Sequence, residues 1–168
     1  MRDYNAALEQ SFYDLFANFL DLEQNTARDY TSDEYSLERM ATLAELAGSP
    51  ERDMRIVHVA GTKGKGSTCM FLDALLRTRN LQTGTFCSPH LVTLRERFMI
   101  NGALPSYDTV LQQARYLVDR VEARAMKPTF FELLTVLALR LFAQAHCQYA
   151  IVETGIGGLL DATNYIQN

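Results

Sequence analysis

Hydrophobic residues recur at a helical spacing near the start of the chain. Over residues 4–24 they form one stripe, which predicts an amphipathic helix: Tyr4, Leu8, Phe12, Leu15, Phe16, Phe19 and Leu22. The polar interval 25–35 predicts a loop. A second helix is expected to begin at Ser36 and to end at Gly48, with Pro50 beyond it, which is the usual order of cap and breaker. Both helices are most simply packing elements.

After residue 54 the pattern alternates between strand-like and helical segments. Short apolar or β-branched runs predict strands, and amphipathic runs between them predict helices. The expected series is a strand at 55–61, a helix at 67–80, a strand at 82–87, a strand and turn at 96–105, a helix at 106–125, a helix at 128–145 and a strand at 149–153. This alternation predicts an α/β fold with a mostly parallel sheet and flanking helices.

Three local signals refine this expectation. The helix at 128–145 is apolar on nearly all sides, so it should be buried between layers. Thr129 and Glu132 fit the capping box T-x-x-E at its start. Asn101-Gly102 is a pair that tolerates positive φ, so a tight turn is expected there.

Composition and charge fit an ordinary globular protein. The 168 residues suit one domain, and we expect a helical segment over 1–50 to pack on a core formed by 51–168. Hydrophobic residues make up 48% of the chain and charged residues 21%, which is usual for such proteins. A formal charge of −4 argues against a nucleic-acid partner held by bulk charge.

Cysteine, histidine and targeting patterns favour a reduced, cytoplasmic protein. The first ten residues lack the apolar segment of a secretory signal, and the most apolar stretch, 135–145, is too short to span a membrane. The three cysteines are odd in number and lack C-x-x-C spacing, so buried free thiols are expected. The three histidines form no pair with metal-ligand spacing, which gives no support to a structural zinc site.

A glycine-rich segment, HVAGTKGKGSTC, joins the first expected strand to the helix at 67–80. It departs from the phosphate-loop pattern G-x-x-x-x-G-K-[ST], because Val59 replaces the first glycine and Gly66 separates Lys65 from Ser67. Its glycines still let backbone N–H groups turn toward a phosphate, and the helix start adds unpaired donors. Nucleotide binding is therefore expected along the whole loop: Gly61, Thr62, Lys63, Gly64, Lys65, Gly66, Ser67 and Thr68.

The side chains of this loop have separable expected roles. Lys65 can reach the β- and γ-phosphates, and a hydroxyl from Ser67 or Thr68 can enter the shell of Mg²⁺. Lys63 adds local positive charge or is simply solvated. The alternative is a strand-to-helix turn without a ligand, but two lysines, three glycines and a Ser-Thr pair in eight residues favour a nucleotide site.

A second anchor is expected at 150–164. Glu153 ends an apolar strand, so it should lie at the carboxyl edge of the sheet beside the phosphate loop, where it could hold Mg²⁺ or orient water. A solvated strand-end glutamate is the plain alternative. Gly155, Gly157 and Gly158 follow it and allow close approach of the backbone to a ligand, although the spacing is not that of a Rossmann site.

Two further polar positions follow the same logic. Ser88 and His90, in CSPHL, come after the second strand and should also reach the carboxyl edge. Ser88 could contact metal or substrate, or could simply open a Ser-Pro turn. His58 is more simply a core or hydrogen-bonded histidine than a catalyst.

Four motifs in order, HVAGTKGKGSTC, FCSPHLVTLRERFMING, TFFELLTVLAL and VETGIGGLLDATN, resemble the folylpolyglutamate synthase and dihydrofolate synthase family. These ATP-dependent ligases are related to the Mur ligases. The resemblance runs from about Ser36 to Asn164, and the loop spelling G-T-[NK]-G-K-G-S is the family's own. It implies a P-loop NTPase-like fold, in which 51–168 would be the N-terminal part of a Mur-ligase central domain.

The resemblance also implies a reaction. ATP would phosphorylate a carboxylate of folate or dihydropteroate, and the amine of L-glutamate would attack the acyl phosphate to form an amide. ATP and Mg²⁺ would be the cofactors, in folate biosynthesis and one-carbon metabolism. The motifs do not distinguish addition of the first glutamate from extension of a polyglutamate tail, or from both activities together.

Residue roles carry over where the motifs match. Lys65 and Glu153 would be catalytic, and Ser67, Ser88 and Glu153 would be Mg²⁺ ligands. The implied substrate-binding residues are Ser88, Pro89, His90, Thr129, Phe131, Asp161 and Ala162. Phe130 and Phe131 can equally be plain core residues of a buried helix.

Two departures from the family pattern matter. Leu159 stands where the family usually has Arg, which removes a cation near the nucleotide and folate region. The chain ends at Asn168, whereas the family continues with further strands, another metal-binding histidine, a modified lysine and a glutamate-binding domain. We therefore expect the chain alone not to complete ligation. If the strand at 149–153 lacks a neighbour, its unpaired backbone would also favour self-association.

Two other function classes remain open from the residues. One is a kinase or NTPase with a variant phosphate loop, and the other is a nonenzymatic nucleotide-binding fragment. SPHL and LDATN have no reason to accompany a generic kinase loop, so they favour the ligase.

Overall fold

A four-stranded sheet organises the part of the chain that the structure, a computed structural model, describes: residues 4–19, 36–155, 158–159 and 161–166. The strands are β1 (Arg55–Val59), β2 (Thr83–Phe86), β3 (Phe98–Ile100) and β4 (Tyr149–Glu153). The α-helices are α1 (Ala6–Phe16), α2 (Leu37–Leu46), α3 (Lys65–Arg77), α4 (Tyr107–Ala123) and α5 (Phe130–Gln144). The short 3-10 helices are η2 (Pro50–Asp53), η3 (Leu94–Arg97) and η4 (Ala162–Tyr165).

The strand order is β1-β4-β2-β3. β4 pairs in parallel with β1 on one side and with β2 on the other, whereas β3 pairs antiparallel with β2. The expectation that β4 might offer an unpaired edge is therefore wrong: within the described residues the sheet ends at β1 and β3. The mostly parallel sheet itself is confirmed, and the antiparallel β3 is reached from β2 through η3.

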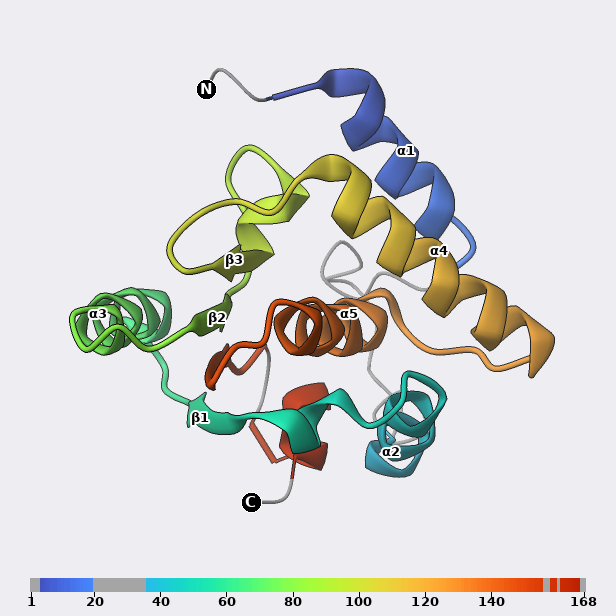
Figure 1. The fold of residues 1–168 in the computed structure, drawn as a ribbon. Helices are drawn as coiled ribbons and strands as arrows, with labels where there is room; N and C mark the ends of the chain where they lie inside the picture. The colour runs from blue at the N-terminus through green and yellow to red at the C-terminus, as the bar shows by residue number, and fades with distance from the viewer. Residues whose placement is uncertain (1–3, 20–35, 156–157, 160, 167–168) are drawn as a thin grey trace.

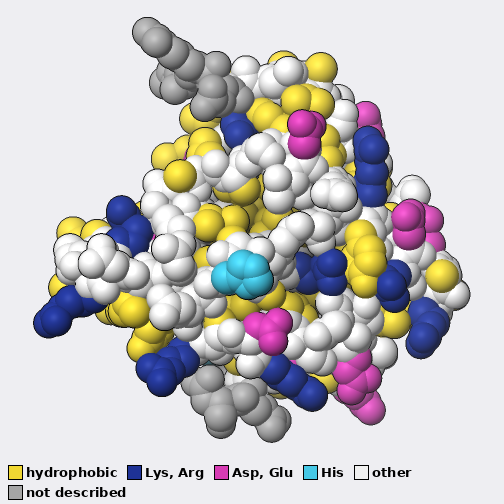
Figure 2. Space-filling model, in the orientation of Figure 1, with side chains coloured by type: hydrophobic (Ala, Val, Ile, Leu, Met, Phe, Trp, Pro, Cys, Tyr) yellow, Lys and Arg dark blue, Asp and Glu magenta, His cyan; other side chains and the backbone are white. Residues whose placement is uncertain are grey.

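Helices cover the sheet unequally on its two faces. Figure 1 shows α5 against one face, with α4 and α1 packed outside it, and α3 against the other face. The polar interval expected at 25–35, and Leu22 of the expected first stripe, lie outside the described residues. On α3 the side chains of Phe71 and Leu75 are 76% and 63% exposed, and hydrophobic side chains are visible where this helix lies in Figure 2. The same view shows acidic and basic side chains interspersed.

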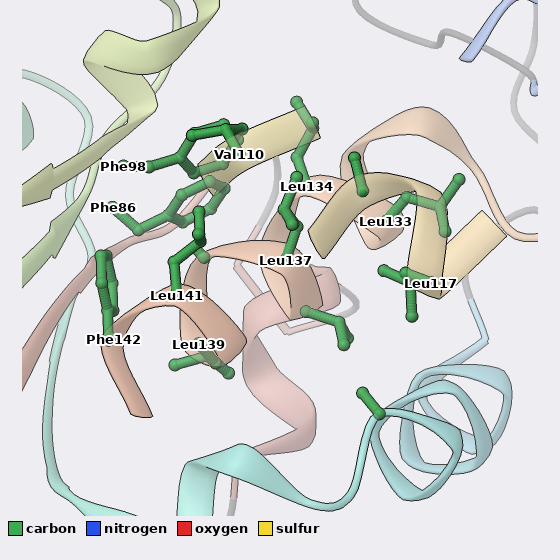
Figure 3. Close-up of a cluster of buried hydrophobic side chains, with 14 of the residues drawn as sticks. Phe86, Phe98, Val110, Leu117, Leu133, Leu134, Leu137, Leu139, Leu141 and Phe142 are labelled. Carbon is green, nitrogen blue, oxygen red and sulfur yellow. The ribbon is translucent and has the colours of Figure 1, made fainter. Parts of the chain in front are cut away.

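The core lies between the sheet and the α4–α5 layer. α5 is buried on nearly all sides, as its apolar sequence predicts, and its leucines meet Phe86 of β2, Phe98 of β3 and the apolar face of α4 (Figure 3). The closest approach is at Gly84, where an added Cβ would overlap the ring of Phe142. Among the described helices, none has the length and hydropathy needed to cross a membrane.

The expected caps and turn are confirmed. Ser36 caps α2 by accepting a hydrogen bond from the N–H of Arg39 at 3.1 Å. Thr129 and Glu132 form the capping box of α5. Asn101 and Gly102 have φ values of 50° and 72°, so both residues occupy the left-handed region that this turn requires.

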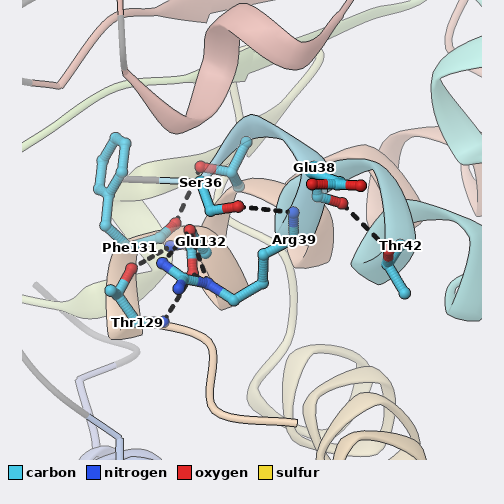
Figure 4. A network of polar contacts seen from close by, with 8 residues as sticks. Ser36, Glu38, Arg39, Thr42, Thr129, Phe131 and Glu132 are labelled. Atoms are coloured by element: carbon cyan, nitrogen blue, oxygen red, sulfur yellow. Dashed lines mark hydrogen bonds and ion pairs between the residues drawn. The ribbon is translucent and has the colours of Figure 1, made fainter. Parts of the chain in front are cut away.

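The capping glutamate also joins α2 to α5. Arg39 Nη2 donates to Glu132 Oε1 at 2.8 Å, and Arg39 Nε donates to Oε2 at 2.9 Å (Figure 4). The N–H of Thr129 donates to the same carboxylate at 2.7 Å. A planar guanidinium facing a carboxylate in this bidentate way is the geometry that makes an ion pair strong.

A second buried carboxylate ties the N-terminal helix to the core. Glu9 of α1 accepts hydrogen bonds from the Thr93 hydroxyl at 2.7 Å, the Leu94 N–H at 2.6 Å and the Tyr107 hydroxyl at 3.1 Å. Phe12 of the same helix is buried and stacks on the ring of Tyr107. α1 and α2 thus contribute to one continuous hydrophobic core with the sheet.

The Arg39–Glu132 pair should be a strong determinant of stability. We expect Glu132→Ala to lower the free energy of unfolding by about 3 kcal/mol, because it removes the glutamate half of the capping box and leaves Arg39 without its bidentate partner. Glu132→Gln keeps the capping box and loses only the charge, so its effect should be smaller. Glu38→Ala, at an exposed position in the first turn of α2, is the control and should cost less than about 1 kcal/mol. Urea denaturation of the three variants measures this, and equal losses for Glu38→Ala and Glu132→Ala would contradict it.

Candidate functional site

The phosphate-type loop connects the end of β1 to the start of α3. Gly64 is the N-terminal cap of α3 and has φ 75°, a left-handed conformation that favours glycine. The first helical hydrogen bond runs from the N–H of Thr68 to the carbonyl of Gly64 at 2.9 Å. The N–H groups of Lys65, Gly66 and Ser67 therefore precede the helical ladder, and the positive end of α3 lies at the same place. Such a loop can bind an anion.

Residues of the loop differ in exposure. Gly61, Thr62, Lys63 and Gly64 are exposed, and so are Ser67 and Thr68 in the first turn of α3. Lys65 is half-buried, with its aliphatic chain close to Gly61. The Thr68 hydroxyl donates to the carbonyl of Gly64 at 2.9 Å, so this side chain closes the helix start.

Glu153 lies beneath this loop, as expected, because β4 and β1 are parallel and in register, with Val59 paired to Glu153. Lys65 Nζ is 3.9 Å from Glu153 Oε1. A Cβ added at Gly66 would lie 3.5 Å from Glu153 Oε2, so at this position no side chain separates the loop backbone from the buried carboxylate. The glycine that breaks the general phosphate-loop spelling thus faces the acid.

The segment after β2 reaches the same carboxylate. The N–H of Ser88 donates to Glu153 Oε2 at 3.2 Å, and the Ser88–Pro89 peptide bond is cis. The sequence expectation that Ser88 lies at the carboxyl edge is therefore confirmed. Pro89 is exposed, and Ser88 is half-buried.

His90 is engaged with the protein through both ring nitrogens. Arg97 Nε donates to His90 Nδ1 at 3.0 Å, so the neutral ring carries its proton on Nε2, which lies 3.0 Å from the hydroxyl of Tyr13. Arg97 is buried and its guanidinium lies over the ring of Phe130 at 6.0 Å. His90 thus joins α1 to the segment after β2, a positioning task that the sequence did not predict.

Of the expected folate-pocket residues, two lie beside Gly155, and Thr129 is part of a helix cap. Phe131 and Asp161 converge on Gly155, where an added Cβ would lie 2.6 Å from Phe131 Cζ and 3.0 Å from Asp161 Oδ2. Phe131 is half-buried against Phe86, whereas its neighbour Phe130 is a core residue that packs on Phe16. The hydroxyl of Thr129 is used in the capping box of α5.

Asp161 caps η4, and Ala162 is buried in its first turn. Asp161 Oδ1 accepts hydrogen bonds from the N–H and the hydroxyl of Thr163, and His58 Nε2 lies 2.6 Å from that hydroxyl. Because the Thr163 hydroxyl donates to Asp161, His58 Nε2 must donate to it. His58 lies inside β1 and is hydrogen-bonded, which confirms its expected structural role. Gly157 lies outside the described residues, and Gly158 has φ 88°.

Cys69 and Cys87 are the site residues that sequence reasoning missed. Their Sγ atoms and a carboxylate oxygen of Glu153 all lie within 4.8 Å of one another. The hydrogen bond with Cys69, together with burial, raises the pKa of the Cys87 thiol. Strand register could have revealed that Cys87 lies near Glu153, since Phe86 pairs with Val152 and the next residues are Cys87 and Glu153.

No protein-family model matches the chain. Among curated proteins, the chain is 40% identical over 137 residues to a folylpolyglutamate synthase of Arabidopsis thaliana, an alignment that covers 78% of this chain and 22% of that protein. It is 39% identical over 136 residues to the dihydrofolate synthetase of Saccharomyces cerevisiae, covering 79% of this chain and 31% of that protein. It is 41% identical over 139 residues to the mitochondrial folylpolyglutamate synthase of Homo sapiens, covering 78% and 24%.

Solved structures give the same picture. Folylpolyglutamate synthase of Mycobacterium tuberculosis complexed with ADP superposes with a TM-score of 0.77 at 33% identity, over 95% of this chain and 34% of that one. E. coli FolC in complex with DHPP and ADP gives a TM-score of 0.79 at 29% identity, over 95% and 36%. The predicted fold class is confirmed. The chain spans between about a fifth and a third of the length of these curated relatives.

Protonation of His58 should weaken the fold. Burial lowers the pKa of His58 below its ordinary value of 6.5, and the charge of Asp161 only partly opposes this. At pH values above about 6.5 both folded and unfolded chains hold a neutral ring; as pH falls, the unfolded chain binds the proton first, so stability decreases until the folded pKa is reached. Unfolding in urea between about pH 7.5 and 5.5 should show this decrease.

Two variants assign the effect to the right histidine. In His58→Gln the decrease should become shallower over the same range. In His146→Asn, which changes an exposed histidine whose φ of 54° asparagine tolerates, the pH dependence should stay as in the parent chain. An unchanged slope in His58→Gln would rule out the assignment.

Proposed function

We propose that this chain, a homologue of folylpolyglutamate and dihydrofolate synthases over most of its length, supplies the ATP-phosphate site of a ligase that joins L-glutamate to a folate-type carboxylate. The relatives' names support the reaction class, and the complexes of two structural neighbours with ADP support a nucleotide ligand. The complex of one neighbour with DHPP supports a second substrate of the folate type.

The observation that carries the proposal is the convergence of three segments at one sheet edge. The glycine loop offers backbone N–H groups and Lys65, β4 offers Glu153, and the segment after β2 offers Ser88. In parallel α/β sheets this edge is where ligands bind. A loop that binds phosphate and an acid that can hold a cation are together the two halves of a nucleoside-triphosphate site.

The donor set fits Mg²⁺. The carboxylate of Glu153 and the hydroxyls of Ser67 and Ser88 are hard oxygen donors of the kind that Mg²⁺ takes together with water and phosphate oxygens. At Gly66 no side chain separates the carboxylate from the loop, where the phosphates would lie. When bound, the ion offsets negative charge on the phosphates.

The chain's own residues would then act by binding and orientation. Lys65 and the N–H groups at the start of α3 would hold the β- and γ-phosphates in line with the attacking carboxylate. The carboxylate oxygen displaces ADP from the γ-phosphorus, which gives an acyl phosphate. The glutamate amine then attacks the acyl carbon, so that phosphate leaves, the amide forms and the amine loses a proton.

The pterin side of the site is proposed around Phe131. Its half-buried ring next to Gly155 and Asp161 offers a flat apolar surface beside polar atoms, which suits a heterocycle. The Thr129 hydroxyl caps α5, and Asp161 Oδ1 caps η4. These two residues are therefore proposed to fix the positions of Phe131 and η4. Leu159 is 79% exposed, so an arginine there would have been free to approach a ligand.

The proposed location is a reducing compartment such as the cytoplasm, which the free thiols of Cys69, Cys87 and Cys147 favour. Several relatives are named as mitochondrial, so an import route is the competing proposal.

Lys65 should be required for nucleotide binding. We expect Lys65→Ala to weaken binding of Mg²⁺-ADP by about ten- to a hundredfold, the equivalent of losing about 1.5–3 kcal/mol of charge-assisted hydrogen bonding to phosphate. Lys127→Ala, at an exposed lysine between α4 and α5, is the control and should change the affinity by less than about threefold. Isothermal titration calorimetry of the three proteins measures this. Equal affinity of the parent chain and Lys65→Ala for Mg²⁺-ADP would contradict the proposal.

A further inference from the structure

Two cysteines and a glutamate meet beneath the phosphate loop. Cys69 comes from the second turn of α3 and Cys87 from the end of β2, while Glu153 ends β4, the strand between β1 and β2. All three ligand atoms lie within 4.8 Å of one another. None of the three cysteines is in a disulfide.

These ligands differ in chemistry from the proposed Mg²⁺ ligands, Ser67, Ser88 and Glu153, with which they share only Glu153. Thiolate sulfur is a soft ligand that selects zinc and related cations, whereas Mg²⁺ prefers oxygen. Zinc–sulfur bonds of about 2.3 Å at tetrahedral angles would place the two sulfurs about 3.7 Å apart. The observed spacing of up to 4.8 Å therefore needs only a small contraction of the side chains.

A divalent cation would offset most of the charge of such a complex. Two thiolates and a carboxylate carry three negative charges, which a divalent cation reduces to one. The remaining negative charge would be close to the ammonium of Lys65, which is 3.9 Å from Glu153, and to the positive N-terminal end of α3. Cys87 is the most accessible of the three ligands, since it is half-buried whereas Cys69 and Glu153 are buried.

We propose that Cys69, Cys87 and Glu153 form a binding site for a thiophilic divalent cation of the Zn²⁺ type, with a fourth position open to water or the Ser88 hydroxyl. This site goes beyond the proposed function, because it gives Glu153 a second and competing ligand. A cation held there removes Glu153 from the Mg²⁺ site, so binding of the thiophilic cation and of Mg²⁺-nucleotide would exclude each other. That last consequence rests on the proposed function, whereas the cation site does not.

The test is a titration of the reduced 168-residue chain with Cd²⁺ in the absence of nucleotide. Cadmium–thiolate bonds absorb in the ultraviolet, so the probe reports sulfur ligation directly. We expect one equivalent to bind, and Cys87→Ser to weaken binding at least tenfold, because it replaces a soft ligand by a hydroxyl of similar size. Cys147→Ser changes a buried cysteine outside the cluster and should leave the affinity unchanged.

Further measurements keep each outcome decisive. Circular dichroism establishes that each variant is folded, and Glu153→Gln offers a second route to weaken the site should Cys87→Ser fail to fold. A thiol count before titration establishes that Cys69 and Cys87 are free. Equal affinity in the parent chain and both variants would overturn the proposal, as would equal weakening in Cys147→Ser or oxidation of the pair to a disulfide in place of metal binding.

Competition separates this inference from the proposed function. Zn²⁺ should weaken Mg²⁺-ADP binding to the parent chain at least tenfold and should have less effect on Cys87→Ser. If the chain binds Cd²⁺ through its cysteines but binds no nucleotide, the cation site stands and the proposed function fails. If it binds nucleotide but no Cd²⁺, the reverse holds.

Discussion

Parallel pairing of β4 between β1 and β2 is the constraint on which the rest of the structure depends. Parallel strands end at the same edge of a sheet, so pairing in register brings the ends of β1, β4 and β2 together from positions about 30 to 90 residues apart along the chain. The phosphate-type loop, Glu153 and the segment from Cys87 to His90 each begin at one of these ends. A shift of β4 by one residue would turn Glu153 to the other face of the sheet.

The local elements could be predicted from the sequence because their signals are local. The capping box at Thr129, the cap at Ser36 and the turn at Asn101-Gly102 involve residues within a few positions of one another. The apolar surface of α5 also predicts its burial, since no side of the helix could face water at low cost.

The missed features all depend on long-range pairing. The central place of β4 is not encoded in its own five residues, and the Cys69–Cys87–Glu153 cluster requires the β2–β4 register as well as the rotation of α3. His90 is predicted to bind substrate, and the pairing that the sequence did not predict is the contact of its ring with Tyr13, 77 residues away. Of the candidate site, the sequence could therefore identify the loop and the acid, and it could not identify the partners that surround them.

Three buried glutamates show where the fold leaves room for a ligand. Glu9 accepts three hydrogen bonds from neighbouring segments, and Glu132 is held by Arg39 and by its own helix cap. Both carboxylates are satisfied, which is how a buried charge becomes tolerable.

Glu153 is just as buried, at 4% exposed, but it is held less well. It has one backbone hydrogen bond of 3.2 Å from Ser88, a thiol contact with Cys87 and a lysine 3.9 Å away. A buried carboxylate with so few partners gains free energy from a cation bound to it, and at Gly66 no side chain separates it from the loop. Because Glu153 has so few partners, its carboxylate would attract either Mg²⁺ bound with a nucleotide at the loop or a thiophilic cation bound by the cysteines. The competition between the two cations therefore follows from the fold.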